Sequence, residues 1–322
     1  MKAYIDILKY VLKNGNMSVN QRTGEEVLRV PSGASFLHNM ADGFPLVTTK
    51  KMGLKNIATE LEFFVHGYTD KKWLQDHGCH IWDEWANPEK WEPIYEQVRH
   101  TLNQNENLMI PGTDEKLKNA IMDGVRDLGP IYGWQWRNWG GEYKWNPYNP
   151  ARNVVESADK NNKSIDQIQN IIDRAKKDPT DRGLIVNAWN PTDEKQMALR
   201  PCHVMHQILI DDGKLNLIWT QRSCDMFLGV PYNIASYALL LLLYAKELGY
   251  EPGMLRGDLH DVHIYANHLD PVKTQIKRKP YPLPTVEIPD TNWKGMLNWV
   301  AKDGFILKDY VCHSALRGEV AR

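Results

Sequence analysis

The sequence contains little cysteine. It has four cysteines in 322 residues, Cys79, Cys202, Cys224 and Cys312, and no two of them form a C-x-x-C pair. A disulfide framework or a zinc site is therefore not expected, and no metal is predicted. This usage favours a reducing compartment, so we expect a cytoplasmic protein.

The chain also has almost no net charge and no apolar run long enough to cross a bilayer. The formal net charge is −1, which argues against a surface for nucleic acid or membrane lipid but not against a small anionic ligand in a local pocket. The long apolar run from Tyr237 to Ala245 is too short to cross a bilayer, and residues 1–8 lack a signal-peptide core. We expect neither a nucleic-acid nor a membrane partner.

What the sequence does contain is the pattern of an α+β protein. Apolar residues make up 42% of the chain, enough for a large core. Helical periodicity predicts helices over residues 2–14, 54–66, 164–176 and 234–248, the last apolar around its circumference and therefore buried. Strand patterns occur at residues 27–30, 184–189, 203–210, 215–221 and 257–265. We predict one domain over residues 1–322, with a mixed, largely antiparallel sheet covered by helices.

One segment interrupts this pattern. Residues 87–127 are polar and charged and contain Pro88, Pro93 and Pro111. We interpret them as an elaboration inserted into the domain, partly helical at about 92–102 and 114–123.

A possible catalytic centre lies at a predicted β-hairpin. Cys202 precedes one strand, and a turn at residues 211–214 folds the next strand back, which brings Arg222 near the cysteine. A nearby guanidinium favours the thiolate, the reactive form of cysteine. The alternative for Cys202 is a buried, unreactive thiol. His203 is expected to point to the opposite face of the strand.

Several polar residues are candidates for binding a nucleotide. Four residues suit a phosphate, because guanidinium donors and a hydroxyl match its oxygens: Arg22, Arg182, Arg222 and Ser223. Any one arginine is interpreted as a solvated surface charge unless the arginines converge. Asn233 offers a donor and an acceptor to a pyrimidine edge, or else it caps the helix that follows.

Three further residues have a functional and a structural interpretation. His263 and Tyr265 alternate along a strand, so both could bond a sugar hydroxyl, or the tyrosine could simply be half-buried. Glu60 lies in a predicted helix beside its apolar face, where a carboxylate needs an explanation.

Together these segments resemble the thymidylate synthase family. The matching stretches, in the family's order, are Arg22-Thr23-Gly24, Asp42 to Lys50, Glu60-Leu61, Ile81 to Ala86, Gly129 to Gly133, Met197 to His203, Gln221 to Tyr237 and His263 to Tyr265. They cover most of the chain outside residues 87–127 and 140–162. The long match from Gln221 to Leu240 is a highly specific signal.

The resemblance implies a fold of that family and a reaction. Cys202 would add to C6 of dUMP, so that C5 becomes a carbon nucleophile, and 5,10-methylenetetrahydrofolate would supply a one-carbon unit to C5. Glu60 would organise water and proton transfer, and Tyr132 would help to remove the C5 proton. The remaining catalytic residues that the resemblance implies are Arg222, Asp225 and Asn233.

The resemblance also implies two sets of binding residues and a partner. The residues expected around the pyrimidine nucleoside monophosphate are Arg22, Arg182, Gln221, Arg222, Ser223, Asp225, Asn233, His263 and Tyr265. The residues expected around the folate are Lys50, Ile81, Trp82, Asp225, Leu228, Gly229, Tyr232 and Ala321. Lys50 would meet the glutamate tail. Because Arg182 would come from the other subunit, a homodimer is expected.

The chain departs from the family's pattern at a few positions. These are Gly53 at a folate-contacting histidine position, Glu62 at a usually apolar position, Gly183 where a second arginine is usual, Leu259-His260 where two glycines are usual, and Arg322 at the end of the closing tail. Changes of this kind suit a wetter or differently sealed cavity.

Two alternatives to the synthase stay open. A folate-dependent 5-hydroxymethylase uses the same cysteine and folate, but water rather than hydride meets the exocyclic methylene. Asn233 argues against dCMP or CMP as its substrate, because cytosine-specific members resemble the family with an aspartate there, whereas dUMP fits. The other alternative is a catalytically idle nucleotide- or RNA-binding homologue, against which the intact Cys202, Glu60 and Tyr132 argue.

Overall fold

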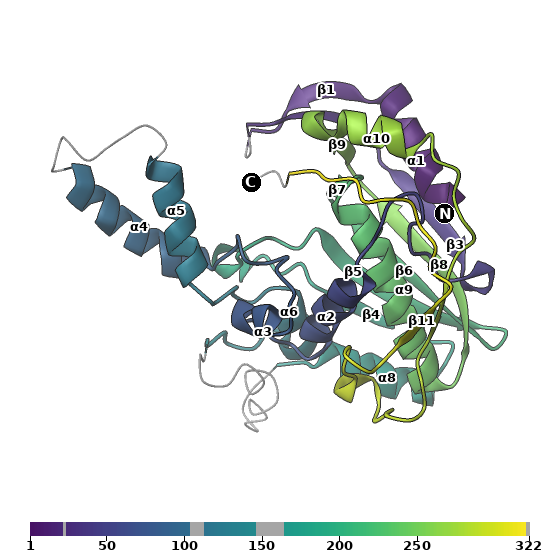
Figure 1. Ribbon diagram of the computed structural model, residues 1–322. Coiled ribbons are helices and arrows are strands. Elements are labelled where there is room, and N and C mark those ends of the chain that lie inside the picture. The colour runs from purple at the N-terminus through teal and green to yellow at the C-terminus, as the bar shows by residue number, and fades with distance from the viewer. Residues whose placement is uncertain (22–23, 104–112, 146–163, 320–322) are drawn as a thin grey trace. The chain divides into compact units, whose positions relative to one another are not determined.

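The computed structural model describes residues 1–21, 24–103, 113–145 and 164–319 (Figure 1). Its chain divides into two compact units. The first unit comprises Met1–Leu61, Ile171–Val186 and Cys202–Arg322, and the second comprises Glu62–Asn170 and Asn187–Pro201. The organisation as one domain over residues 1–322 stays a prediction.

A five-stranded sheet forms the centre of the first unit. Its strands, in spatial order, are β3 (Ala34–Asn39), β8 (Glu251–Leu259), β6 (Lys214–Gln221), β5 (His203–Asp211) and β4 (Ile185–Asn187). β3 pairs with β8, and β5 with β6, in antiparallel fashion, whereas β6 and β8 are parallel. The sheet is therefore mixed and largely antiparallel, as predicted.

The hairpin of β5 and β6 has the predicted turn. Asp212 and Gly213 both have positive φ, 47° and 72°, which matches a two-residue Asp-Gly turn of type I′. The register runs from Asp211 opposite Lys214 to His203 opposite Gln221, with an irregularity between His203 and Met205. The open end of the hairpin thus places residue 202 next to residue 222.

A second sheet of the first unit has four strands. Its order is β1 (Asn16–Val19), β2 (Glu26–Val30), β9 (Val262–Tyr265) and β7 (Cys224–Asp225). The prediction of one strand over residues 257–265 is wrong, because β8 and β9 belong to different sheets. The chain turns between them at Asp261, whose φ of 42° is incompatible with a continuous strand.

Helices cover these sheets. The helices of the first unit, two of which continue into the second unit, are α1 (Lys2–Asn14), α2 (Leu54–Val65), α8 (Gln167–Lys177), α9 (Gly229–Leu248) and α10 (Leu269–Gln275). α9 packs against β6 and β8, and most of its residues are buried, as its apolar circumference predicted. It begins five residues earlier than predicted, at Gly229, and ends at Gly249, which has the left-handed conformation of a helix C-cap. A small antiparallel pair, β10 (Thr285–Glu287) and β11 (Ile306–Lys308), follows.

The second unit is mainly helical. Its helices are α3 (Lys71–Asp76), α4 (Pro88–Asn103), α5 (Thr113–Gly124) and α6 (Tyr132–Asn138). α4 and α5 pack against each other within the segment of residues 87–127, which confirms that this segment is partly helical.

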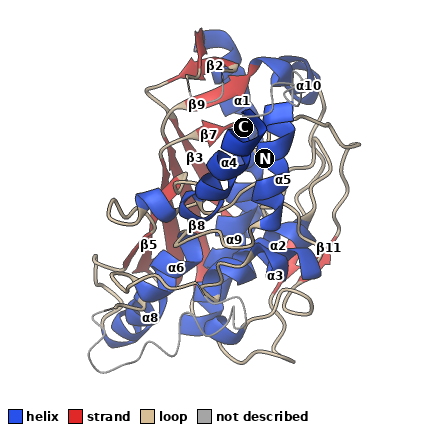
Figure 2. Cartoon of the chain, turned by 90° about the vertical axis from the view of Figure 1, so that its left-hand side faces the viewer, coloured by secondary structure: helices blue, strands red, loops and turns tan. Residues whose placement is uncertain are grey.

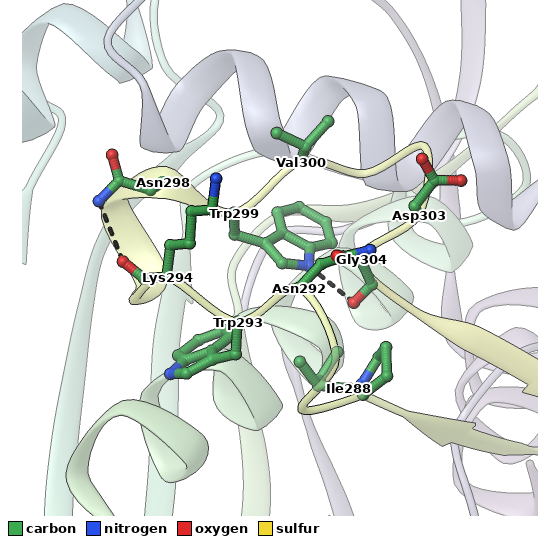
Figure 3. A pocket seen from close by; sticks show the side chains of 10 residues that line it. Ile288, Asn292, Trp293, Lys294, Asn298, Trp299, Val300, Asp303 and Gly304 are labelled. Atoms are coloured by element: carbon green, nitrogen blue, oxygen red, sulfur yellow. Dashed lines mark hydrogen bonds between the residues drawn. The ribbon is translucent and has the colours of Figure 1, made fainter.

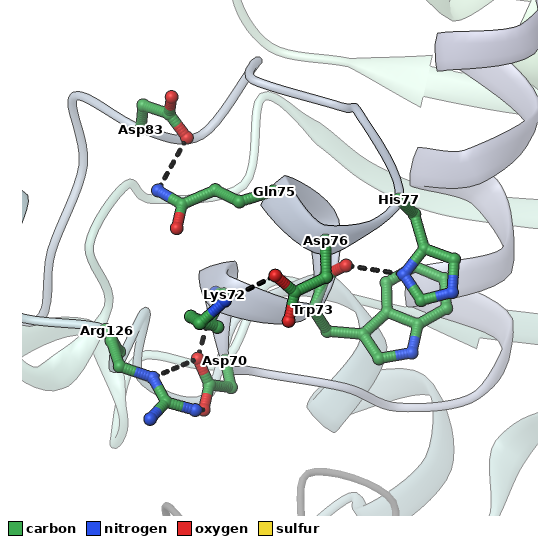
Figure 4. A network of polar contacts seen from close by, with 8 residues as sticks. All are labelled: Asp70, Lys72, Trp73, Gln75, Asp76, His77, Asp83 and Arg126. Atoms are coloured by element: carbon green, nitrogen blue, oxygen red, sulfur yellow. Dashed lines mark hydrogen bonds and ion pairs between the residues drawn. The ribbon is translucent and has the colours of Figure 1, made fainter.

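Buried polar contacts join the two ends of that segment. The backbone N–H of Asn87 donates to the carbonyl oxygen of Asp127 at 2.8 Å. The ammonium of Lys71, a residue only 1% exposed, donates to three carbonyl oxygens, those of Asp83, Trp85 and Met122, at 2.8, 3.0 and 2.8 Å. A neighbouring network joins Arg126 to the buried Asp70, which caps α3 (Figure 4).

Helices and largely antiparallel sheets together give the predicted α+β class (Figure 2). Of the helices in the described ranges, none combines the length and the hydrophobicity that a bilayer span requires.

Candidate functional site

Cys202 lies at the open end of the hairpin, directly before β5. The backbone N–H of Arg222 donates to the carbonyl oxygen of Cys202 at 2.8 Å, so the two residues face each other across the hairpin. Cys202 is half-buried, and none of the four cysteines, all within the described ranges, is disulfide-bonded. Cys224 is buried instead, and burial raises the pKa of its thiol. Cys202 is therefore the more accessible of these two thiols, and Cys224 is the inert one.

His203 is buried and points into the core, toward α9. Its Nδ1 lies 2.8 Å from the hydroxyl of Tyr237 on α9. Complete burial lowers the pKa of His203 to about 3, so the imidazole is neutral at physiological pH.

Asn233 lies inside α9 and is held by Gln221 from the end of β6. Gln221 Nε2 donates to Asn233 Oδ1 at 3.1 Å and to the carbonyl oxygen of Ser223 at 3.0 Å. The interpretation of Asn233 as a helix cap is wrong, because the N-cap of α9 is Leu228. The Asn233 amide therefore does not cap the helix, and its Nδ2 has no acceptor among the residues that the structure describes.

Asp225 organises the turn that leads into α9. Its Oδ1 accepts hydrogen bonds from the backbone N–H groups of Phe227, at 2.9 Å, and Leu228, at 3.3 Å. Asp225 on β7 is also paired with His263 on β9. The next residue after Leu228 is Gly229, and a Cβ placed there would make ordinary van der Waals contact, at 3.8 Å, with Asp225 Cβ and Asn233 Oδ1.

His263 and Tyr265 lie on the same strand with their rings against each other. The ring centroids are 5.3 Å apart, with an interplanar angle of 88°. His263 Nδ1 lies 2.8 Å from the carbonyl oxygen of Asp261, which suggests the tautomer that carries a proton on Nδ1. Asp261 in turn accepts from Arg29 Nε at 2.8 Å.

Lys50 is buried rather than extended into solvent. Its ammonium donates to the carbonyl oxygen of Phe227 and lies 4.0 Å from the centroid of the Phe227 ring. Burial lowers the pKa of Lys50 to about 8, against the opposing attraction of Asp225. A contact between Lys50 and a glutamate tail stays a prediction.

The other predicted site residues of the first unit lie on different elements. Glu60 lies half-buried on α2, and Tyr232 lies half-buried on α9. Arg182 is exposed, and its carbonyl oxygen accepts from Gln207 Nε2 of β5 at 2.7 Å. Arg22 and Ala321 lie outside the described residues.

Three predicted residues belong to the second unit. Tyr132, at the start of α6, is 3% exposed, and its ring packs 4.9 Å from that of Phe64 and 6.1 Å from that of Trp82. Trp82 is buried, whereas Ile81 is 39% exposed.

No sequence motif identified the residues that hold the turn before Tyr132. The carboxylate of Asp127 accepts from the backbone N–H of Gly129 at 2.7 Å, from Asn87 Nδ2 at 3.0 Å and from the hydroxyl of Tyr143. Burial raises the pKa of Asp127, although these three bonds oppose the rise. Gly129 has a φ of 73°, and a Cβ there would lie 1.8 Å from the carbonyl oxygen of Gln196. Only glycine fits this turn.

A metal cluster and a second cavity are two further possibilities for a site. Nowhere among the described residues do three or more His, Cys, Asp or Glu side chains gather as they would around a metal ion. A cavity of about 260 Å³ in the first unit is lined by residues 288–304, among them Trp293, Trp299 and Asp303 (Figure 3). None of the described site residues lines this cavity.

Comparison with known proteins agrees with the resemblance. A family model described as thymidylate synthase matches residues 2–322. The chain is 37% identical over 318 residues to a bifunctional dihydrofolate reductase-thymidylate synthase of Paramecium tetraurelia, a match that covers 99% of this chain. The chain spans 60% of the length of that relative.

Proposed function

Because the chain belongs to the thymidylate synthase family, we propose that it is a methyltransferase that converts dUMP to dTMP with 5,10-methylenetetrahydrofolate. The observation that supports this most is the placement of Cys202. It is half-buried opposite Arg222, at the end of the hairpin from which Gln221 reaches Asn233. This placement of Cys202, Arg222 and Asn233 on adjoining elements supports the proposal that they serve as nucleophile, phosphate ligand and reader of the base.

The proposed chemistry begins at the thiolate of Cys202. Its sulfur forms a bond to C6 of the uracil, and the electron pair of the C5–C6 double bond moves toward C5 and O4. The Nδ2 donor of Asn233 suits the charge that develops on O4. Folate supplies the one-carbon unit and, for a methyl product, the hydride that reduces it.

Loss of the C5 proton and expulsion of the sulfur complete the proposed reaction. The C5 proton leaves to a base, and its electron pair expels the folate nitrogen, which leaves an exocyclic methylene on C5. When hydride reduces this methylene to methyl, the electron pair returns to the ring and the C6–sulfur bond breaks, which restores the double bond and the free Cys202. We assign organisation of water and proton transfer to Glu60, and help in removing the C5 proton to Tyr132. These two assignments rest on the family alone.

Further contacts to the nucleotide are proposed on the same ground. The phosphate would be held by Arg22, Arg222 and Ser223, together with Arg182 of the partner subunit, and the sugar by His263 and Tyr265. The exposure of Arg182 is compatible with a role across a subunit boundary. Along β6, buried and half-exposed side chains alternate, so one face of the sheet reaches the surface of the single chain. A homodimer that covers this face is what we propose.

The folate is proposed to lie against the start of α9. The residues assigned to it are Lys50, Ile81, Trp82, Asp225, Leu228, Gly229, Tyr232 and Ala321. A cytoplasmic location is proposed on the cysteine usage alone.

One observation favours the 5-hydroxymethylase as a second candidate. Gly53 stands where the family has a folate-contacting histidine, and a Cβ at Gly53 would meet nothing within 4 Å. Open space at this position suits a cavity that admits water to the exocyclic methylene. Water in place of hydride would give 5-hydroxymethyl-dUMP.

The product distinguishes these candidates. The protein is incubated with methylenetetrahydrofolate and either dUMP or dCMP, and products are identified by absorbance and mass. dTMP with dihydrofolate supports the synthase, and a hydroxymethyl nucleotide with tetrahydrofolate supports the second candidate. Tight binding of dUMP without turnover would indicate the idle homologue. Cys202→Ser, a nearly isosteric change, should abolish either product, and activity in that variant would refute the covalent route.

A further inference from the structure

Trp219 is a fully buried residue of β6. It is linked to the side-chain amide of Asn233 through one intermediate residue, Gln221. It lies two positions before Gln221, so the two side chains point to the same face of the sheet. The indole Nε1–H of Trp219 donates to Gln221 Oε1 at 3.2 Å. Gln221 Nε2 then donates to Asn233 Oδ1 at 3.1 Å. An uninterrupted chain of two hydrogen bonds therefore links the indole to Asn233.

The direction of this chain is fixed by its outer members. An indole N–H can only donate, so the atom of Gln221 that faces it must be the oxygen. A backbone carbonyl can only accept, so the atom that faces Ser223 must be the nitrogen, which agrees with the 3.0 Å bond from Gln221 Nε2. Because that same nitrogen also faces Asn233, Asn233 must present its oxygen to Gln221. Its Nδ2 donors are then directed elsewhere.

Packing keeps the indole in this position. Its ring stacks on that of Tyr237, with centroids 5.1 Å apart and planes 6° apart, and lies 5.9 Å from the ring of Phe36. On β8, a Cβ at Gly257 would come within 2.5 Å of the Trp219 ring, so a glycine is needed there. The donor of Trp219 is thus held in one place before any ligand arrives.

We propose that Trp219 is a positioning residue that orients Asn233, through Gln221, for a 4-oxo rather than a 4-amino pyrimidine. A uracil carries an acceptor at C4, which the Nδ2 donor of Asn233 satisfies, whereas a cytosine carries an amino group that would meet a second donor. This inference rests on the proposed function, in that it takes Asn233 to face the base.

Loss of the indole N–H should weaken this preference. Without it, Gln221 Oε1 is buried without a donor, which removes part of the advantage of the observed amide direction. In the reversed direction, the oxygen of Gln221 would face Asn233, which would donate to it and turn its own oxygen toward the base. The same oxygen would then face the Ser223 carbonyl, so that the bond to this carbonyl is lost, and the reversed direction becomes less costly than before without becoming the preferred one. A 4-amino pyrimidine then becomes an acceptable partner.

The test is the ratio of binding constants for dUMP and dCMP, measured by calorimetry on the full chain without folate. In Trp219→Phe, we expect the preference for dUMP over dCMP to fall by about tenfold, a change typical of one buried hydrogen bond. Tyr237→Phe is the matched control, because it removes a buried hydrogen bond beside the same ring stack, that between the Tyr237 hydroxyl and His203 Nδ1, without touching the chain to Asn233. Its ratio should equal that of the unmodified protein.

The outcomes separate this inference from the proposed function. If Trp219→Phe weakens both nucleotides in parallel and leaves the ratio unchanged, Trp219 is merely structural and the inference is wrong. If the unmodified protein binds neither nucleotide, the proposed function itself fails. Should Trp219→Phe not fold, the same ratio is measured with benzothienylalanine at position 219, which keeps the ring shape and replaces the N–H by sulfur. An unchanged ratio there would again refute the inference.

Discussion

Lys50 offers a prediction in which the pH dependence of stability can be worked out from one buried group. Its side chain is almost fully buried, its ammonium donates to the carbonyl oxygen of Phe227, and its pKa is lowered to about 8 by burial. In the unfolded chain, a lysine has its ordinary pKa of roughly 10.4. Lys50→Met removes this titration and keeps a side chain of similar length.

The sign follows from proton binding. Between the two pKa values the unfolded chain holds more protons at Lys50 than the folded chain, so stability rises with pH across this window. Below it, the folded protein carries a buried charge at a cost. Across the whole window the free energy of unfolding rises by about 3 kcal/mol, of which about 2 kcal/mol falls between pH values near 7 and 9.5.

Urea unfolding near pH 7 and near pH 9.5 measures the effect. The stability of the unmodified protein relative to Lys50→Met should increase by about 2 kcal/mol over this interval. Lys51→Met, at the exposed neighbouring position, is the control and should show no comparable change with pH. A pH-independent difference between the unmodified protein and Lys50→Met would refute the assignment of a buried, titrating ammonium.

Two further predictions concern the turn that leads into Tyr132. Gly129→Ala forces a Cβ to within 1.8 Å of the Gln196 carbonyl oxygen at a φ of 73°, and should lower the free energy of unfolding by about 3 kcal/mol or more; a urea midpoint equal to that of the unmodified protein would contradict the geometry. Asp127→Ala leaves Asn87 Nδ2 and the Gly129 N–H without their acceptor, and leaves the Tyr143 hydroxyl with Thr69 Oγ1 at 3.1 Å; it should cost about 3 kcal/mol. Denaturant unfolding checks it, and a loss under 1 kcal/mol, roughly one ordinary hydrogen bond, would show that water replaces the carboxylate.

Local patterns were sufficient to predict much of the fold. The Asp212-Gly213 turn specifies its own hairpin, since both residues tolerate positive φ, and the apolar circumference of residues 234–248 identifies the buried helix. The break at Asp261 was not predictable in this way. Residues on its two sides are both strand-like, and only pairing with distant strands sends β8 and β9 into different sheets.

Some residues of the candidate site could likewise be predicted from local sequence patterns, and others could not. Cys202 and Arg222 could be brought together from the sequence because a hairpin of known register joins them. The residues that hold the turn before Tyr132 could not be predicted in this way, because Asp127 accepts hydrogen bonds from Asn87 and Tyr143, which are remote in sequence. Trp219 lies between these cases. Its spacing of two residues from Gln221 on a strand is a visible signal, but the partner of its N–H is decided by packing.

The most direct test of the central claim is whether Cys202 forms a covalent bond to the pyrimidine. The protein is mixed with methylenetetrahydrofolate and 5-fluoro-dUMP, whose fluorine cannot leave C5 as the proton does, so that a bond at C6 persists. Mass spectrometry of the peptide containing Cys202 should show the added mass of nucleotide and folate, and Cys202→Ser should not. An unmodified Cys202 peptide after complete saturation, or the adduct on Cys224 instead, would contradict the account.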